Sequence, residues 1–151
     1  MRNGTVGEFL QKHENPFDLV FVREDESIAN VLKKMIHSKE ERLVYVVDAK
    51  KRLQGIISTG RLMQHLFHEK IAPESGFSPS ANILQYLTAE HAKDIMDIDI
   101  VYCKKEESLE SALHKMFGKH SKKVIPVVDG EMHVIDALNV ISLMEFTLEN
   151  M

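Results

Sequence analysis

The sequence repeats itself, and this repeat limits the chain to folds that are built from two similar halves. When the chain is shifted by 81 positions, Val20–Asp48 lies over Val101–Asp129. Identical pairs in this window include Glu26 with Glu107, Lys34 with Lys115, and Asp48 with Asp129. Upstream, the segment TVGEFL (5–10) matches HAKDIM (91–96), with five extra residues in the first copy. The chain therefore consists of two diverged copies of one structural motif.

The offset between the two copies changes after the shared Asp48 and Asp129. We align the second copy there with a three-residue deletion. This alignment places Asp136 opposite Ser58. It also places Asn139 opposite Arg61.

Each copy predicts the element order β-α-β-β-α, because short apolar runs alternate with segments that have apolar residues at helical spacing. The ranges expected in the first copy are strand Leu19–Val22, a helix containing Ile28, Val31, Leu32 and Met35, strand 43–48, strand Gln54–Ile57 and helix Thr59–Glu69. Those expected in the second copy are strand Ile100–Cys103, a helix containing Leu109, Ala112, Leu113 and Met116, strand 124–129, strand His133–Ile135 and helix Ala137–Glu149.

The fold class that follows is α/β (α+β), with two β-α-β-β-α repeats. The first crossover of each copy predicts two parallel strands. Because a half of about 50–60 residues buries too little apolar surface to be stable alone, we expect the two repeats to pack about a pseudo-twofold axis. We place repeat 1 at 5–69, a connecting loop and short helix at 70–87, and repeat 2 at 88–150, with Asn82 and Thr88 as candidate helix caps.

Composition and motifs exclude several classes of function. The 19 Lys and Arg residues against 23 Asp and Glu give a net charge of −4, which disfavours a nucleic-acid partner. The apolar runs are far shorter than the roughly 20 residues of a membrane helix, and no secretory signal is visible, so we expect a cytoplasmic protein without a membrane partner. We find no nucleophile motif, phosphate-binding loop or paired carboxylates, so we predict that the chain is not an enzyme. His65 and His68 lie three positions apart, as two metal ligands on a helix could. No cysteine lies near them and no HExxH pattern is present, since the one cysteine is Cys103, so we predict no metal site.

Two of the strand sequences resemble a known family. VIPVVD (124–129) and LVYVVD (43–48), together with the lead-in AKDIM (92–96), resemble the CBS-domain pair, or Bateman module. The resemblance implies a stand-alone regulatory protein that binds adenosine-containing ligands such as AMP, ADP, ATP or S-adenosylmethionine in clefts between its repeats. It also implies a homodimer that acts on a separate protein, which remains unknown. No cofactor is implied beyond a possible regulatory adenine nucleotide.

The family's ribose–phosphate motif, G-h-h-[S/T]-x-x-[D/N] with h apolar, follows the third strand. In the first copy it reads Gly55-Ile56-Ile57-Ser58-Thr59-Gly60-Arg61, and in the second we align it with His133–Asn139. This spacing puts the hydroxyl residue at a helix N-cap and the last residue one turn further on. Free N–H groups at a helix start suit a phosphate, and the last residue can bond ribose hydroxyls.

The two copies depart from this motif in opposite ways. Arg61 replaces a ribose-binding carboxylate with a donor that suits phosphate, whereas Asp136 at the second N-cap would repel phosphate. We therefore expect the first copy to favour anions and the second, with Asn139, to hold a neutral nucleoside or nothing. The alternatives are that Asp136 only caps a helix and that Arg61 is a surface or ion-pairing residue.

The resemblance also implies a set of apolar cleft residues, each of which could instead be plain core. These residues are Val20, Phe21, Tyr45, Ile100, Val101 and Pro126. Two hypotheses remain: a nucleotide-sensing regulator, or a ligand-free dimeric interaction module with degenerate nucleotide sites. The apolar helix faces expected at a dimer interface contain Leu62, Leu66, Phe67, Ile141, Met144 and Leu148, which could also be covered within one chain.

Overall fold

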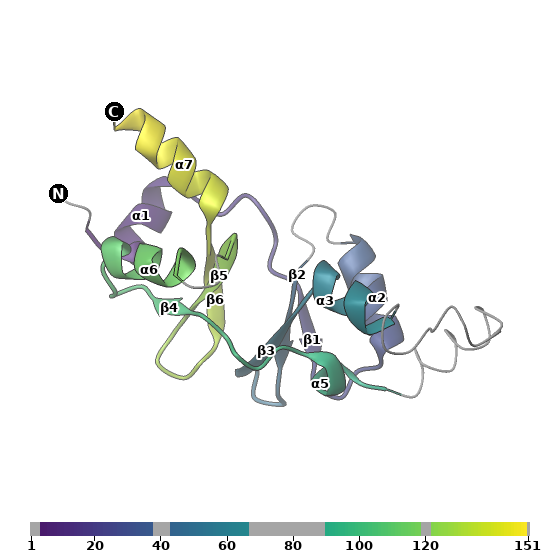
Figure 1. Ribbon diagram of the computed structural model, residues 1–151. Coiled ribbons are helices and arrows are strands. Elements are labelled where there is room, and N and C mark those ends of the chain that lie inside the picture. The colour runs from purple at the N-terminus through teal and green to yellow at the C-terminus, as the bar shows by residue number, and fades with distance from the viewer. Residues whose placement is uncertain (1–3, 38–42, 67–89, 119–121, 151) are drawn as a thin grey trace. The chain divides into compact units, whose positions relative to one another are not determined.

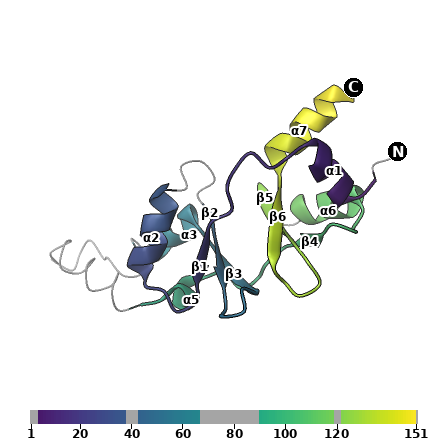
Figure 2. The same cartoon turned by 180° about the vertical axis from the view of Figure 1, so that it is seen from behind.

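A computed structural model describes residues 4–37, 43–66, 90–118 and 122–150. The chain divides into two compact units, which are shown from opposite sides in Figures 1 and 2. We call Asp18–Ile100 the first unit, and Met1–Phe17 together with Val101–Met151 the second unit. Each unit holds one three-stranded sheet, which confirms the predicted α/β class.

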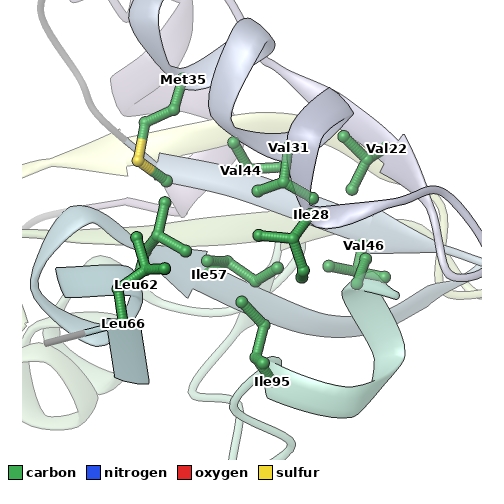
Figure 3. Close-up of a cluster of buried hydrophobic side chains, with 11 residues drawn as sticks. Val22, Ile28, Val31, Met35, Val44, Val46, Ile57, Leu62, Leu66 and Ile95 are labelled. Atoms are coloured by element: carbon green, nitrogen blue, oxygen red, sulfur yellow. The ribbon is translucent and has the colours of Figure 1, made fainter. Parts of the chain in front are cut away.

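The first unit is built on the strand order β1-β2-β3. Its elements are β1 (Phe21–Arg23), α2 (Ile28–His37), β2 (Leu43–Val47), β3 (Leu53–Ser58), α3 (Thr59–Gln64) and α5 (Ala92–Ile95). β1 and β2 are parallel, as predicted, and β2 and β3 are antiparallel. Figure 3 shows the core of this unit, where Val31 and Met35 of α2 lie over Val44 and Ile57 of the sheet.

The second unit repeats this arrangement with the order β4-β5-β6. Its elements are α1 (Val6–Lys12), β4 (Cys103–Lys104), α6 (Leu109–Met116), β5 (Val124–Val128), β6 (Val134–Asn139) and α7 (Val140–Glu149). β4 and β5 are parallel, and β5 and β6 are antiparallel. The core of this unit gathers Val6 and Phe9 of α1 with Ala112 and Met116 of α6 and with Leu138 of β6.

Each unit contains a helix that the sequence attaches to the other copy. α1 precedes the first copy but packs in the second unit, where Val6 N–H donates to Glu107 O at 2.9 Å. α5 precedes the second copy but packs in the first unit, where Ala92 N–H donates to Glu26 O at 2.8 Å. The compact units therefore exchange the lead-in helices of the two sequence repeats (Figure 1).

The sheet register shows that the second copy contains no three-residue deletion, which corrects our alignment. Val44 pairs with Ile57 in the first unit, and Ile125 pairs with Leu138 in the second, so the offset of 81 positions continues through the third strand. The hairpin turns match as well, with positive φ at Lys51 (65°) and at Met132 (66°). The hairpin turn after Asp129 thus has its left-handed residue at Met132.

The first strand of the second unit, β4, is shorter than that of the first unit, β1, because one residue differs between their neighbouring strands β2 and β5. Tyr45 N–H donates to Val20 O at 2.9 Å, and Tyr45 pairs with Phe21 in the parallel ladder. Pro126 holds the equivalent position in β5 and has no N–H to donate. The parallel ladder of the second unit accordingly starts one position later, at Cys103 opposite Val127.

Several expected features fall outside the described residues or differ at their ends. The connection at 70–87, the short helix after Asn82, and the end of the helix expected to reach Glu69 lie outside them. The last helix begins at Val140 rather than Ala137, since β6 extends to Asn139.

Candidate ligand-binding junctions

The junction between β3 and α3 carries the polar residues predicted in the first copy. Ser58 is the N-cap of α3, and its Oγ accepts a hydrogen bond from Arg61 N–H at 3.1 Å. Thr59 follows, half-buried, with its hydroxyl 3.4 Å from Met35 Sδ. Because a hydroxyl that accepts one bond can still donate another, Ser58 keeps a donor for a ligand.

The side chain of Arg61 is bonded to backbone rather than to a carboxylate. Its Nε donates to the carbonyl oxygen of Ile95, and one Nη donates to the carbonyl oxygen of Met96 at 3.3 Å. These carbonyls end α5, where unpaired carbonyl groups attract a cation. If Arg61 binds a phosphate as predicted, it must do so with the N–H groups that these two hydrogen bonds leave.

The second junction differs from our expectation. Asn139, not Asp136, is the N-cap of α7, and its Oδ1 accepts from Ile141 N–H at 2.7 Å. Asp136 lies inside β6 opposite Val127, and its Oδ1 accepts from the adjacent Ala137 N–H at 2.8 Å. The prediction that Asp136 caps this helix is wrong, because β6 continues to Asn139, three residues beyond Asp136. The predicted effect of this carboxylate on a phosphate stays a prediction.

The corrected alignment brings a residue to the second junction that we did not single out. Ser142 holds the position of Arg61, and Asn139 holds the position of Ser58. Asn139 is 3% exposed and Ser142 is 4% exposed, whereas Arg61 is exposed. An unbroken offset of 81 would have revealed Ser142, since Leu62-Met63 and Leu143-Met144 are identical at that offset.

The predicted apolar residues fall into two groups. In the first unit, Phe21 and Tyr45 are ladder partners whose rings lie 5.9 Å apart, and Val20 packs against the core. Ile100 is half-buried at the end of this unit. In the second unit, Val101 packs against the core and Pro126 is buried within β5. Their role in binding a ligand stays a prediction.

The residues that are identical between the copies support the scaffold. Lys34 Nζ donates to Phe21 O at 2.6 Å, and Lys115 Nζ donates to Tyr102 O at 3.0 Å, so each lysine ties its helix to the first strand region. Lys115 also pairs with Glu107 at 2.9 Å. Burial opposes ionisation of Glu107, but hydrogen bonds from Lys115 and Ser111 hold its pKa below the ordinary value. These repeated charges therefore stabilise local structure.

Asp48 and Asp129 hold the two hairpin turns in the same way. Asp48 Oδ1 accepts from Lys50 and Arg52 N–H, each at 2.9 Å, and its Oδ2 accepts from Arg52 Nε at 2.8 Å. Asp129 Oδ1 accepts from the backbone of Glu131 and His133 at 2.9 Å. Hydrogen bonds from the backbone of Arg52 and of His133 lower the pKa of Asp48 and of Asp129, respectively.

Other chemistry is sparse in the described part of the chain. Burial raises the pKa of the Cys103 thiol to about 12, so this cysteine is a poor nucleophile. Among the described residues, no three His, Cys, Asp or Glu side chains gather as a metal site would require. In the same part of the chain, no helix combines the length and apolar character needed to cross a bilayer.

Comparison with known proteins identifies the repeat. The sequence pattern of the family described as CBS domain matches residues 6–68 and 92–148. A search of curated proteins finds no match to this chain.

Solved structures of similar fold include two CBS-domain proteins and one cytosolic channel domain. A CBS domain-containing protein from Thermotoga maritima is 25% identical, with a TM-score of 0.72 and coverage of 99% of this chain and 97% of that one. The CBS domain pair of protein MJ0100, in complex with 5′-methylthioadenosine and S-adenosyl-L-methionine, is 16% identical, with a TM-score of 0.69 and coverage of 99% and 100%.

The third is the cytosolic domain of the Mg2+ channel MgtE in complex with ATP. It is 23% identical, with a TM-score of 0.63, and the match covers 92% of this chain and 52% of that one. The family pattern spans both repeats, and these structures share the fold of the whole chain. This chain therefore belongs to the CBS-domain family.

Proposed function

We propose that this chain is a regulatory module that binds an adenosine-containing nucleotide at the β3–α3 junction and passes the change to a separate protein. The observation that carries the proposal is the sequence Gly55-Ile56-Ile57-Ser58, which keeps the first four positions of the family motif and places Ser58 at an N-cap. The two relatives with bound ATP, or with 5′-methylthioadenosine and S-adenosyl-L-methionine, support this ligand class.

The first junction is the better candidate for a nucleotide phosphate. It offers an exposed arginine and half-buried hydroxyls, whereas Asn139 and Ser142 at the second junction are neutral and buried. A phosphate forms its strongest contacts with charged donors. Neither junction has a carboxylate at the ribose position, since Arg61 and Ser142 stand there. We therefore expect the ligand's phosphates to contribute more to binding than its ribose does.

A ligand titration tests this proposal. Thermal unfolding and calorimetry with AMP, ADP, ATP and S-adenosylmethionine should show stabilisation, which amounts to about 2.7 kcal/mol when the ligand is present at 100 times its Kd. Thr59→Val, which removes one hydroxyl at little change of volume, should weaken binding by about tenfold. Thr147→Val, which removes a hydroxyl of α7, is the matched control and should bind as the wild type does.

The second candidate function is a ligand-free interaction module. It is favoured by one observation: Ser58, Asn139 and Arg61 each already bond to backbone groups of their own unit. On this reading, none of the four ligands changes the midpoint of unfolding, and that result would contradict nucleotide sensing.

We further propose that the protein is a cytoplasmic homodimer. Exposed apolar residues recur at equivalent positions of both units, at the end of the first long helix (Ile36 and Phe117) and in the helix after the third strand (Met63 and Met144). Leu62 and Leu66 do not belong to such a face, because both are buried in their own unit. Sedimentation should give twice the chain mass, and Phe117→Glu should lower it toward the monomer.

A further inference from the structure

We propose that Arg61 couples an anionic ligand to the segment 92–97, by holding the end of α5 with one edge of its guanidinium and a phosphate group with the other. The inference rests on the proposed function, because it names a regulatory contact of the same junction.

The contacts of Arg61 leave part of its guanidinium for a ligand. Nε and one N–H of an Nη group donate to the carbonyl oxygens of Ile95 and Met96. These two N–H groups belong to one edge of the planar guanidinium, which carries five N–H groups in all. The end of the guanidinium formed by its two Nη groups keeps one N–H from each, and this end has the geometry for a paired contact with phosphate. Because Arg61 is exposed, a dissolved anion can reach it.

The end of α5 positions this arginine before any ligand binds. α5 stops at Ile95, and Met96 takes an extended ψ of 149°, so the last carbonyls have no partner within the helix. The guanidinium satisfies two of them. A side chain that is already held loses less conformational freedom when it binds a second group, and the anion is bound more tightly as a result.

The segment held by Arg61 is itself part of the first unit. Asp97 N–H donates to Ile56 O at 2.8 Å, and Ile56 N–H donates to Asp97 O at 3.0 Å, which joins the segment to β3. The side chain of Ile95 points into the core toward Ile57 (Figure 3). The segment then runs to Ile100, the last residue of the unit. A change in its order would therefore act where the chain leaves the first unit.

Thermodynamic linkage makes the coupling reciprocal. If an ordered segment 92–97 strengthens anion binding, anion binding strengthens the order of that segment by the same factor. Coupling of this kind commonly amounts to about fivefold or more. The second unit has no counterpart, because Ser142 replaces Arg61 and its side chain is short and neutral.

Amide hydrogen exchange at Asp97 tests the proposal, because this amide reports the bond to Ile56. Without ligand, Arg61→Ala should exchange at Asp97 about fivefold faster than the wild type or more. With saturating ATP, the wild type should exchange about fivefold slower, and Arg61→Ala should show no such slowing and bind ATP about tenfold more weakly. Arg61→Lys keeps the charge without the two-edged fork, so it should bind ATP better than Arg61→Ala while losing the slowing.

Arg23→Ala is the matched control, because it removes an exposed arginine of the same unit. It should leave the exchange rate of Asp97 unchanged. Equal Asp97 rates in the ligand-free wild type and Arg61→Ala would overturn the role of Arg61 at α5. ATP that binds by calorimetry without slowing Asp97 would overturn the coupling and leave the proposed function standing. Failure of ATP to bind would contradict nucleotide binding and the coupling, while the ligand-free comparison would still decide whether Arg61 holds the segment.

Discussion

The two units share one backbone plan, yet their lead-in segments end differently. In both, the start of the segment is bonded to the turn after the first strand, through Val6 to Glu107 in one unit and Ala92 to Glu26 in the other. In the first unit the segment then leaves its helix and joins β3 through Asp97 and Ile56. In the second unit, α1 instead continues as a helix to Lys12.

A glycine in β3 accounts for this difference. A Cβ atom on Gly55 would lie 2.6 Å from Cγ and Sδ of Met96, so the methionine lies where a side chain would otherwise stand. Asp136 occupies the equivalent position in β6 and carries such a side chain. The comparison teaches that the absence of one Cβ atom allows an extended segment to lie against the strand, and with it the contacts of Arg61.

The largest expected loss of stability comes from substitutions in the two cores, and these substitutions also test whether the two units unfold independently. Ile57→Ala and Leu138→Ala remove equivalent residues that are both fully buried, and each should cost about 2–5 kcal/mol of unfolding free energy. Hydrogen exchange should accelerate mainly in the unit that carries the substitution. Equal acceleration in both units would mean that they unfold as one. Ile98→Ala, at an exposed position outside the proposed dimer surface, is the control and should have little effect.

The next largest loss of stability is expected at Gly55, the residue that distinguishes β3 of the first unit from β6 of the second. Gly55→Ala should destabilise the chain by about 1–3 kcal/mol, because Met96 must move to admit the methyl group. Chemical denaturation measures the cost, and faster exchange at Asp97 locates it. Gly130→Ala is the control, since no atom lies within 4 Å of its added Cβ. An equal cost for both substitutions would refute the role given to the contact with Met96.

A smaller change in stability is expected at the two hairpin turns, which have the same conformation in both units. Lys51 and Met132 both have positive φ, a conformation that costs most residues about 1–2 kcal/mol and glycine little. Lys51→Gly and Met132→Gly should therefore each raise the unfolding free energy, by up to about 1 kcal/mol after the greater unfolded-state entropy of glycine is subtracted. Denaturant midpoints measure both gains. A gain at only one turn would show that the two hairpins are not equivalent.

The smallest effect is a dependence on pH, since it involves one carboxylate. The pKa of Asp48 in the folded chain lies below its ordinary value, so its bonds stabilise the fold above about pH 4 and are lost as the pH falls through the folded pKa. The stability difference between wild type and Asp48→Asn should thus be constant near neutral pH and shrink in acid. The difference between wild type and Asp129→Asn should also shrink in acid, because backbone N–H groups of Glu131 and His133 bond this carboxylate. A difference that grows in acid would contradict this account.

Much of the architecture could be predicted from the sequence. The duplication, the α/β class, the parallel first strands and the buried helix faces all follow from local pattern and the repeated apolar spacing. The candidate site was harder to predict. Ser58 was correctly placed at a helix N-cap, but a helix start expected at Ala137 put Asp136 at a cap that Asn139 provides.

The sequence by itself determined that two copies of one motif exist and which faces of the helices after the first strands are apolar, because apolar periodicity is a local property. Only the tertiary structure decided the alignment after Asp48, since the pairing of Ile125 with Leu138 fixes the register from across the sheet. It also decided that each lead-in helix packs with the other copy and that Arg61 holds the end of α5. Those contacts join residues tens of positions apart, and a linear pattern does not record which distant carbonyl a side chain will meet.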